Sequence, residues 1–141
     1  MPLRFTIAEL QNFLVDVFPQ VIDDFVIEVL DDDMTRVRMK ISDKHLRPGG
    51  TVSGPSMFTL ADCAMYMAVL ARIGPKALAV TTNCSIDFMR KPVANTDIIA
   101  ECRIHKLGRV LAVGDALIYS DGLAAPVARA SLTYSIPPVA G

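Results

Sequence analysis

The chain has 141 residues, with 14 basic and 15 acidic side chains and a formal net charge of −1. A chain of this length is most simply one domain, residues 1–141, with a sizeable core. A charge so near zero gives no electrostatic footprint for nucleic acid or a membrane surface, so neither partner is expected. The chain is 52% hydrophobic and has a mean hydropathy of +0.39. This is more apolar surface than a small monomer usually buries, which favours an oligomer.

The three cysteines, Cys63, Cys84 and Cys102, lie in apolar or strand-like contexts without metal-type spacing. Such cysteines are typical of reduced, buried side chains in a cytosolic protein. His45 and His105 are too few and too far apart for a metal site, so no metal is expected. The first residues also lack the apolar segment of a signal peptide, which predicts a cytoplasmic location.

Residues 1–20 predict an N-terminal helical segment. Thr6 and Glu9 have the spacing of a capping box, apolar residues recur every three or four positions over 7–18, and Pro19 ends the pattern.

Residue patterns of period two predict antiparallel strands in the rest of the chain, apart from one helix. The strands are expected at 25–30, 35–42, 78–88, 98–104, 110–119 and 127–136. In the strand at 78–88, alternation places the even-numbered residues, Thr82 among them, on the face that packs against the core helix.

Residues 53–71 form the element around which the other elements are expected to pack. Residues 53–55 are typical of a helix start, and after the first turn only Thr59 and Asp62 are not apolar. A helix that is apolar on all sides is buried, and this one is too short to span a bilayer. Because a lone buried carboxylate is unfavourable, Asp62 requires either partners or a function. The elements together predict an α+β fold in which a curved antiparallel sheet of about six strands wraps around a long central helix.

The run from His45 to Pro55, followed by Leu60-Ala61-Asp62, resembles the signature of acyl-CoA thioesterases of the hot-dog fold. The nearest subgroup is the phenylacetate-degradation type, whose pattern is Asn-x-x-Gly-x-x-His-Gly-Gly and then an acid nine residues after the His. Gly50, Gly54 and Asp62 fall on this pattern, and the resemblance extends over roughly residues 24–136. The chain departs from it with Arg47 for the Asn, Ser53 for the His and Pro55 for the second Gly.

The resemblance implies a thioesterase without a metal or cofactor, acting on a small-to-medium or aromatic acyl-CoA. It assigns polarisation of the thioester carbonyl to the backbone N–H of Gly54, the role of base or nucleophile to Asp62, and a water-holding role to Thr82. Gly54 and Asp62 are eight positions apart, about 12 Å along one helix, so both cannot reach one thioester group. Two antiparallel helices across a twofold axis would bring them together, so we expect a homodimer, or a dimer of dimers, with the site at its interface.

The candidate site residues follow from this comparison. The catalytic candidates are Asp62, Gly54, Thr82, Arg47 and Ser53. The candidates for binding substrate or coenzyme A are Gly50, Pro55, Arg90, Lys91, Lys106 and Arg109, the four cations lying where the resemblance implies coenzyme A phosphates.

Plainer explanations stay open for these residues. Asp62 could be a structural acid bonded to Thr59, and Ser53 and Gly54 could serve only as a helix cap. Arg47 could be a solvated loop cation or a partner of Asp62, and the four rim cations could simply be solvated.

Two further functions compete with hydrolysis. The first is a catalytically weak hot-dog protein that binds acyl-CoA, which the departures at 47, 53 and 55 favour. The second is a dehydratase of the same fold, which ranks lower because such enzymes use a His near the helix start and this loop offers only His45.

Overall fold

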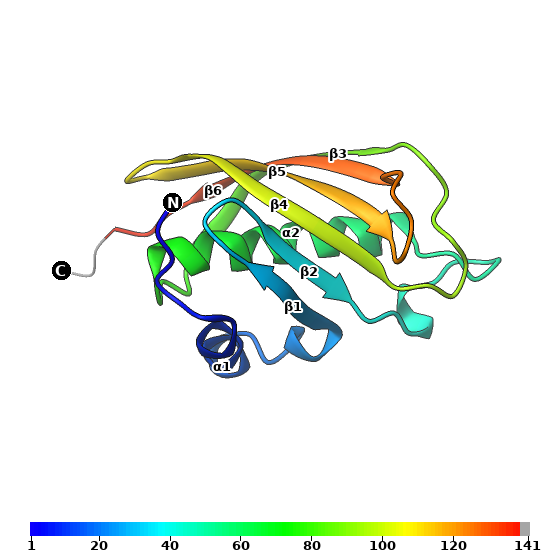
Figure 1. Ribbon diagram of the computed structural model, residues 1–141, viewed down its shortest axis with the longest axis horizontal. Helices are drawn as coiled ribbons and strands as arrows, with labels where there is room; N and C mark the ends of the chain where they lie inside the picture. Colours follow the sequence, from blue (N-terminus) through cyan, green and yellow to red (C-terminus); the bar gives the residue numbers. More distant parts are fainter. Residues whose placement is uncertain (139–141) are drawn as a thin grey trace.

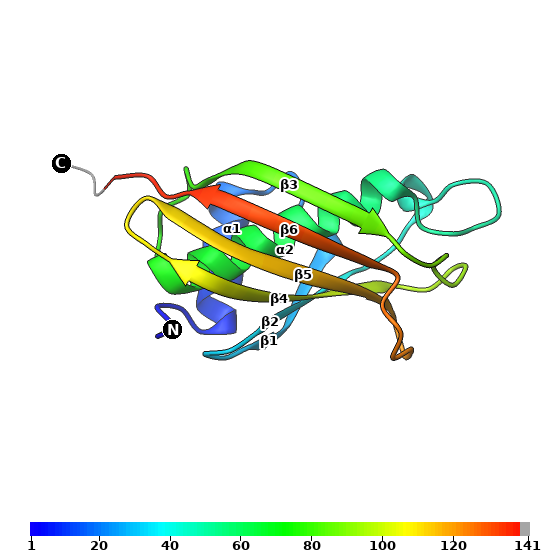
Figure 2. The same cartoon turned by 90° about the horizontal axis from the view of Figure 1, so that it is seen from above.

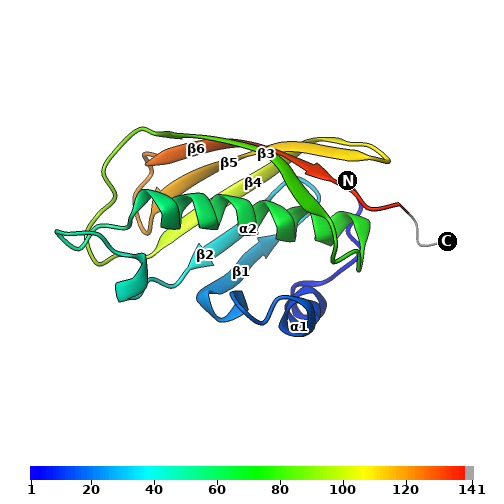
Figure 3. The same ribbon diagram turned by 180° about the vertical axis from the view of Figure 1, so that it is seen from behind.

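The computed structural model describes residues 1–138 and has the predicted α+β architecture, a six-stranded antiparallel sheet packed on a long helix. The elements are α1 (Ile7–Val17), η1 (Ile22–Asp24), β1 (Phe25–Leu30), β2 (Thr35–Met39), η2 (Asp43–His45), α2 (Gly54–Ile73), β3 (Val80–Phe88), β4 (Ile98–Leu107), β5 (Leu111–Ser120) and β6 (Ala128–Ser135). The strand order is β1-β2-β4-β5-β6-β3, and the sheet curves around α2 (Figure 1). Seen from behind, α2 lies along the concave face of the sheet, with α1 beyond β1 (Figure 3).

The N-terminal helix forms as its capping pattern predicts. The backbone N–H of Glu9 donates to Thr6 Oγ1 at 3.2 Å, and the N–H of Thr6 donates to Glu9 Oε1 at 2.9 Å. Leu10 and Leu14 lie one turn apart and are fully buried, so α1 covers part of the core with one face.

The central helix α2 begins with Ser53 as its N-cap, whose Oγ accepts from the N–H of Ser56 at 3.3 Å. It runs for 20 residues and stops at Gly74, whose φ of +88° suits glycine. The prediction that this helix is too short to span a bilayer is wrong, because its length and composition would allow it. However, 78% of its most apolar 18-residue window is buried inside the domain, as expected for a core helix.

A bulge in β3 changes which of its residues face α2. Thr81 pairs with Tyr134 and Asn83 pairs with Thr133, so β3 has one extra residue at this point. An extra residue reverses the alternation of side chains on the N-terminal side of the bulge. Thr81 therefore points inward, whereas Thr82 is exposed and its Oγ1 donates to Thr133 O at 3.3 Å. The prediction that Thr82 faces the core helix is wrong for this reason.

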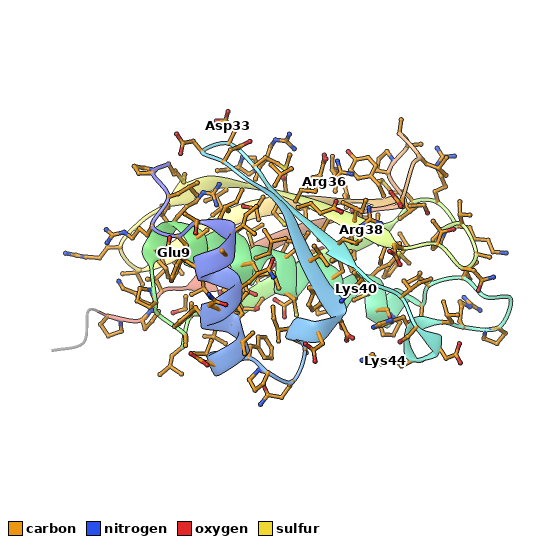
Figure 4. The ribbon with its side chains drawn as sticks, turned by 60° about the horizontal axis from the view of Figure 1, so that its bottom comes forward. Glu9, Asp33, Arg36, Arg38, Lys40 and Lys44 are labelled. Atoms are coloured by element: carbon orange, nitrogen blue, oxygen red, sulfur yellow. The ribbon has the colours of Figure 1, made fainter. Side chains whose placement is uncertain are left out.

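The outer face of β2 carries the basic side chains that its alternation predicts (Figure 4). Arg38 Nε lies 2.7 Å from Glu28 Oε2, and Arg36 Nε lies 3.1 Å from Glu28 Oε1. Val37 and Met39 alternate with these arginines and are buried beneath them. Both arginines are therefore ion-paired within the domain.

Gly114 on β5 stands where no side chain fits. A Cβ at this position would lie 2.4 Å from Arg103 O and 3.0 Å from Met65 Cε. We expect Gly114→Ala to lower the free energy of unfolding by about 1–3 kcal/mol, because the β4–β5 pair must move apart. Urea unfolding measures this change, and Gly108→Ala is the matched control, since its Cβ would come no closer than 3.4 Å to another atom. Equal stability of the two variants would contradict the prediction.

Candidate functional site

The start of α2 opens onto a cavity of about 630 Å³. The backbone N–H of Gly54 has no hydrogen-bond partner among residues 1–138, whereas the N–H groups of Ser56 and Met57 donate to Ser53. The positive end of the helix dipole lies at this N–H. Gly54 therefore offers one free donor, in an electropositive position, to a group bound in the cavity. The residues lining it are Arg47, Pro48, Thr51, Val52, Gly54, Met57, Phe88, Met89, Arg90, Lys91 and Pro92.

The loop before α2 is held by backbone contacts that fix the position of Gly54. The carbonyl of His45, a buried residue, accepts from the N–H of Ser53 at 2.8 Å. Gly50 has a φ of +78°, and its carbonyl accepts from the N–H of Asn95 at 2.9 Å. A side chain at 50 would be strained in this conformation, so the glycine of the motif shapes the loop.

Asp62 lies two turns further along α2, half-buried beside β3 and β6. Thr81 Oγ1 donates to Asp62 Oδ1, and the hydroxyl of Tyr134 lies 2.7 Å from the same oxygen. Thr59 Oγ1 donates to Pro55 O instead, at 3.0 Å, so the suggestion that Asp62 is bonded to Thr59 is wrong. The carboxylate of Asp62 thus has hydrogen-bond partners on two strands, β3 and β6.

The carboxylate borders a second, smaller cavity of about 290 Å³ between α1, α2 and β3. Burial and the neighbouring charge of Asp62 raise the pKa of Cys63 to about 12. Burial and the same charge also raise the pKa of Tyr134. Both groups stay protonated near neutral pH, so neither a thiolate nor a phenolate is present in this cavity. Its lining is Val17, Phe18, Asp62, Cys63, Tyr66, Ala77, Ala79, Val80, Thr81 and Tyr134.

Within one chain, the predicted catalytic residues fall into two places. Gly54 and Arg47 line the first cavity, next to the N-cap Ser53, whereas Asp62 lines the second. Thr82, on the exposed face of β3, lines neither. Arg47 is exposed, and no ion pair joins it to Asp62 among the described residues. One chain alone does not bring the N–H of Gly54 to the carboxylate.

The four predicted coenzyme A-binding cations are also divided. Arg90 and Lys91 line the cavity at Gly54, and Pro55 is exposed beside it. Arg109 lines a third cavity of about 640 Å³ near the C-terminal end of α2, and Lys106 is exposed on the same β4–β5 hairpin. Figure 1 shows this hairpin and the loop before α2 at opposite ends of the molecule.

A stripe of α2 and an edge of the sheet are left uncovered in one chain. Pro55, Phe58, Thr59 and Asp62 recur at the spacing of one helix face and are exposed or half-buried. β3 is an edge strand on the side of the sheet opposite β1 (Figure 2), and its residues Val80 and Phe88 are exposed. We call the four α2 residues the α2 stripe.

Sequence reasoning missed two residues of the Asp62 cavity. Alternation in the sequence favours Thr82 over Thr81, because the bulge leaves no trace in a run of strand-forming residues. Tyr134 could have been placed on the inner face of β6 by alternation, but nothing in the sequence identifies its contact with Asp62. Among residues 1–138, no three His, Cys, Asp or Glu side chains are gathered so that they could hold a metal ion.

Comparison with known proteins connects this geometry to a family. A family model described as the Thioesterase superfamily matches residues 49–126. A Pseudomonas aeruginosa protein named "Putative esterase PA0474" is 30% identical over 101 residues, which is 72% of this chain and 74% of that protein.

Solved structures share the fold. A "putative thioesterase" from Silicibacter sp. TM1040 is 54% identical with a TM-score of 0.92, covering 98% of this chain and 96% of its own. A mutant of the phenylacetic acid degradation protein PaaI from Thermus thermophilus is 26% identical, with a TM-score of 0.71 over 84% of this chain and 99% of its own. A hypothetical thioesterase from Streptococcus pneumoniae TIGR4, solved with coenzyme A, is 22% identical with a TM-score of 0.70, covering 82% and 90% of the two chains.

Proposed function

This chain belongs to the thioesterase superfamily, and from that premise we propose that it hydrolyses a small-to-medium or aromatic acyl-CoA at a site shared by two copies of the chain. The observation that carries the proposal is a pair of complementary half-sites. One is the unpaired N–H of Gly54 at the start of α2, and the other is the half-buried carboxylate of Asp62 beside a small cavity. Acyl transfer requires both a donor for the developing oxyanion and a base or nucleophile.

The α2 stripe supports the pairing of two chains. If two α2 helices pack antiparallel with Gly54 of one opposite Asp62 of the other, residue 58 lies at the twofold axis, midway between them. Phe58 is 40% exposed and stands at the middle of the stripe. An exposed aromatic side chain on a largely buried helix fits a partner helix there.

The reaction then follows from the two half-sites. The N–H of Gly54 binds the carbonyl oxygen of the thioester and stabilises the negative charge that develops on it. The carboxylate of Asp62 takes a proton from a water molecule that attacks the carbonyl carbon, or attacks that carbon itself. The C–S bond breaks, and the sulfur leaves with the electron pair and takes up a proton, which gives coenzyme A. Attack by water gives the free acid directly, whereas attack by Asp62 gives a mixed anhydride that a water molecule then hydrolyses to the free acid and the regenerated carboxylate.

The cations at the start of α2 lie beside the proposed site. Arg47, Arg90 and Lys91 surround the Gly54 half-site. With residue 58 at the twofold axis, Gly54 faces Asp62 of the partner, and the C-terminal end of the partner's α2, with the hairpin that carries Lys106 and Arg109, lies about 16 Å further along. The cations at the Gly54 half-site are therefore the ones best placed to bind the phosphates of coenzyme A. The Streptococcus pneumoniae structure with coenzyme A is consistent with a ligand of this kind.

Exchange of Arg90 for Gln should raise KM for an acyl-CoA about fivefold and leave kcat nearly unchanged, because an exposed ion pair contributes little and acts on binding. The effect should shrink as ionic strength rises. The measurement compares the CoA ester with the pantetheine ester of the same acid, which lacks the nucleotide phosphates. Arg103→Gln is the control, since Arg103 is exposed and lines none of the three cavities. An equal rise in KM for both esters would place the phosphates elsewhere.

The second candidate function is a weakly catalytic acyl-CoA-binding protein, and one structural observation favours it. Pro55 has no N–H, and the N–H groups of Ser56 and Met57 are already bonded to Ser53. With respect to partners in residues 1–138, Gly54 is therefore the one free backbone donor in the first turn of α2, which limits oxyanion stabilisation.

Thiol release measured across a panel of acyl-CoA esters decides between the two functions. The thioesterase proposal expects turnover that favours small-to-medium or aromatic acyl groups over long chains, because the Asp62 cavity is small. Tight binding of acyl-CoA without thiol release for any ester would favour the binding protein.

A further inference from the structure

Tyr134 is the one tyrosine whose hydroxyl reaches the acid of the proposed site within the described chain. Its oxygen lies 2.7 Å from Asp62 Oδ1 and 2.7 Å from the carbonyl oxygen of Asp62. The residue is buried, so water does not replace this contact. Because a phenol has one proton, it can donate to only one of these two oxygens at a time.

The fold brings two donors to the same carboxylate oxygen. Thr81 and Tyr134 are direct partners in the β3–β6 ladder, so their side chains share a face of the sheet. The bulge that follows Thr81 turns this face towards α2 at Asp62. Thr81 Oγ1 donates to Oδ1 and the Tyr134 hydroxyl lies within hydrogen-bond distance of it, whereas Oδ2 has no hydrogen-bond partner among residues 1–138.

The ring of Tyr134 is itself held in place. It stacks on the ring of Tyr66 with centroids 6.3 Å apart, and the hydroxyl of Tyr66 donates to Ala77 O at 2.7 Å. Phe18, which follows α1, packs edge-on against Tyr66 at 5.8 Å. The Tyr134 hydroxyl is therefore directed at Asp62 by packing from both helical segments.

We propose that Tyr134 is a positioning residue for Asp62, and that Oδ2 is the oxygen that takes the proton or attacks the thioester. Two donors fix Oδ1 and orient the plane of the carboxylate, so that Oδ2 faces the substrate. This inference rests on the proposed thioesterase function.

The other titratable groups around Asp62 do not change charge near neutral pH. Burial raises the pKa of each of them. They are Cys63 and Tyr66 on α2, Cys84 on β3 and Tyr134 on β6, and the charge of Asp24 also acts on Cys63. A shift in the acid limb of the pH–rate profile therefore reports on Asp62.

The test replaces Tyr134 with Phe and measures the pH dependence of hydrolysis. Loss of one hydrogen bond to a charged group should move the acid limb to higher pH by about one unit. On the plateau kcat should fall while KM stays nearly constant, because the hydroxyl contacts Asp62 and not the substrate. Tyr119→Phe is the matched control, since Tyr119 lies on β5 and lines neither proposed half-site.

A second readout needs no activity. The carboxylate carbons of the wild type and of Tyr134→Phe, labelled with ¹³C-aspartate, are titrated by NMR, and the Asp62 signal is identified by its loss in Asp62→Asn. Its titration midpoint should rise in Tyr134→Phe. If that variant does not fold, 3,5-difluorotyrosine at position 134 provides a stronger donor, and the midpoint should fall instead.

The titration of Asp62 and the activity of the wild type test separate claims. An unmoved midpoint in a folded Tyr134→Phe protein, with only its stability lowered, would show that the hydroxyl serves the carbonyl of Asp62 and would overturn the inference. A wild type that hydrolyses no acyl-CoA would contradict the proposed thioesterase function. The NMR titration would still report on the contact between Tyr134 and Asp62.

Discussion

Exchange of Asp62 for Asn should reduce kcat for acyl-CoA hydrolysis by about two orders of magnitude or more and leave the fold intact. The amide keeps the shape of the carboxylate but cannot accept a proton or attack a carbonyl. Its oxygen can still accept from Thr81 and Tyr134, which donate to Asp62 Oδ1 in the wild type. The variant should therefore melt near the wild-type temperature while its turnover is lost.

The measurement is a thiol-release assay alongside thermal unfolding. Asp33→Asn is the matched control, because Asp33 is exposed at the turn between β1 and β2 (Figure 4) and should leave the rate unchanged. The Asp62 variant should also keep its affinity for acyl-CoA, since the carboxylate is assigned to chemistry rather than to holding the nucleotide. Full activity in Asp62→Asn would make the acid structural and would favour the binding-protein function.

Regular alternation made most of the fold predictable from the sequence. The capping box at Thr6 and Glu9, the turn after β1 and the buried face of β2 all depend on residues close together in the chain. Local rules govern such elements, so a pattern of period two or 3.6 is sufficient to find them.

Features that depend on distant residues were not predictable in the same way. Thr81 and Thr82 have identical side chains, and which of them faces α2 is decided by a bulge in the pairing of β3 with β6. The division of Arg90 and Arg109 between opposite ends of the molecule likewise follows from the topology of the sheet. No local pattern contains this information, because it is set by which strands pair and in what register.

The composition of α2 hides the distinction between core and interface. Phe58 is as apolar as the buried residues around it, yet it is 40% exposed in one chain. An interface between copies of a chain is built from the same residue types as a core, so hydropathy does not separate them. The high apolar content predicts that another copy of the chain covers part of the surface. The structure identifies the α2 stripe as the helix face that one chain leaves uncovered.

Exchange of Phe58 for Asp should convert the protein to monomers and lower hydrolysis by about two orders of magnitude or more. Two carboxylates facing each other at the proposed twofold axis would repel and would have to be desolvated. Because Phe58 is already partly exposed, the monomer should keep its fold. Sedimentation velocity and circular dichroism measure the two effects, and Leu123→Asp is the control, as Leu123 is 51% exposed in the β5–β6 loop and lies outside the α2 stripe. A dimer that survives this change with full activity would move the twofold axis away from the α2 stripe.

Mixing two inactive variants tests the shared site without breaking the dimer. Gly54→Pro removes the proposed oxyanion donor, and proline is tolerated in the first turn of a helix. In a heterodimer of Gly54→Pro with Asp62→Asn, one site receives Gly54 from one chain and Asp62 from the other, and the second site receives neither. After random exchange of subunits, half of the dimers are mixed and each has one whole site, so about a quarter of wild-type activity should return. If Gly54 and Asp62 of the same chain acted together, every site in the mixture would lack one group, and no activity would return.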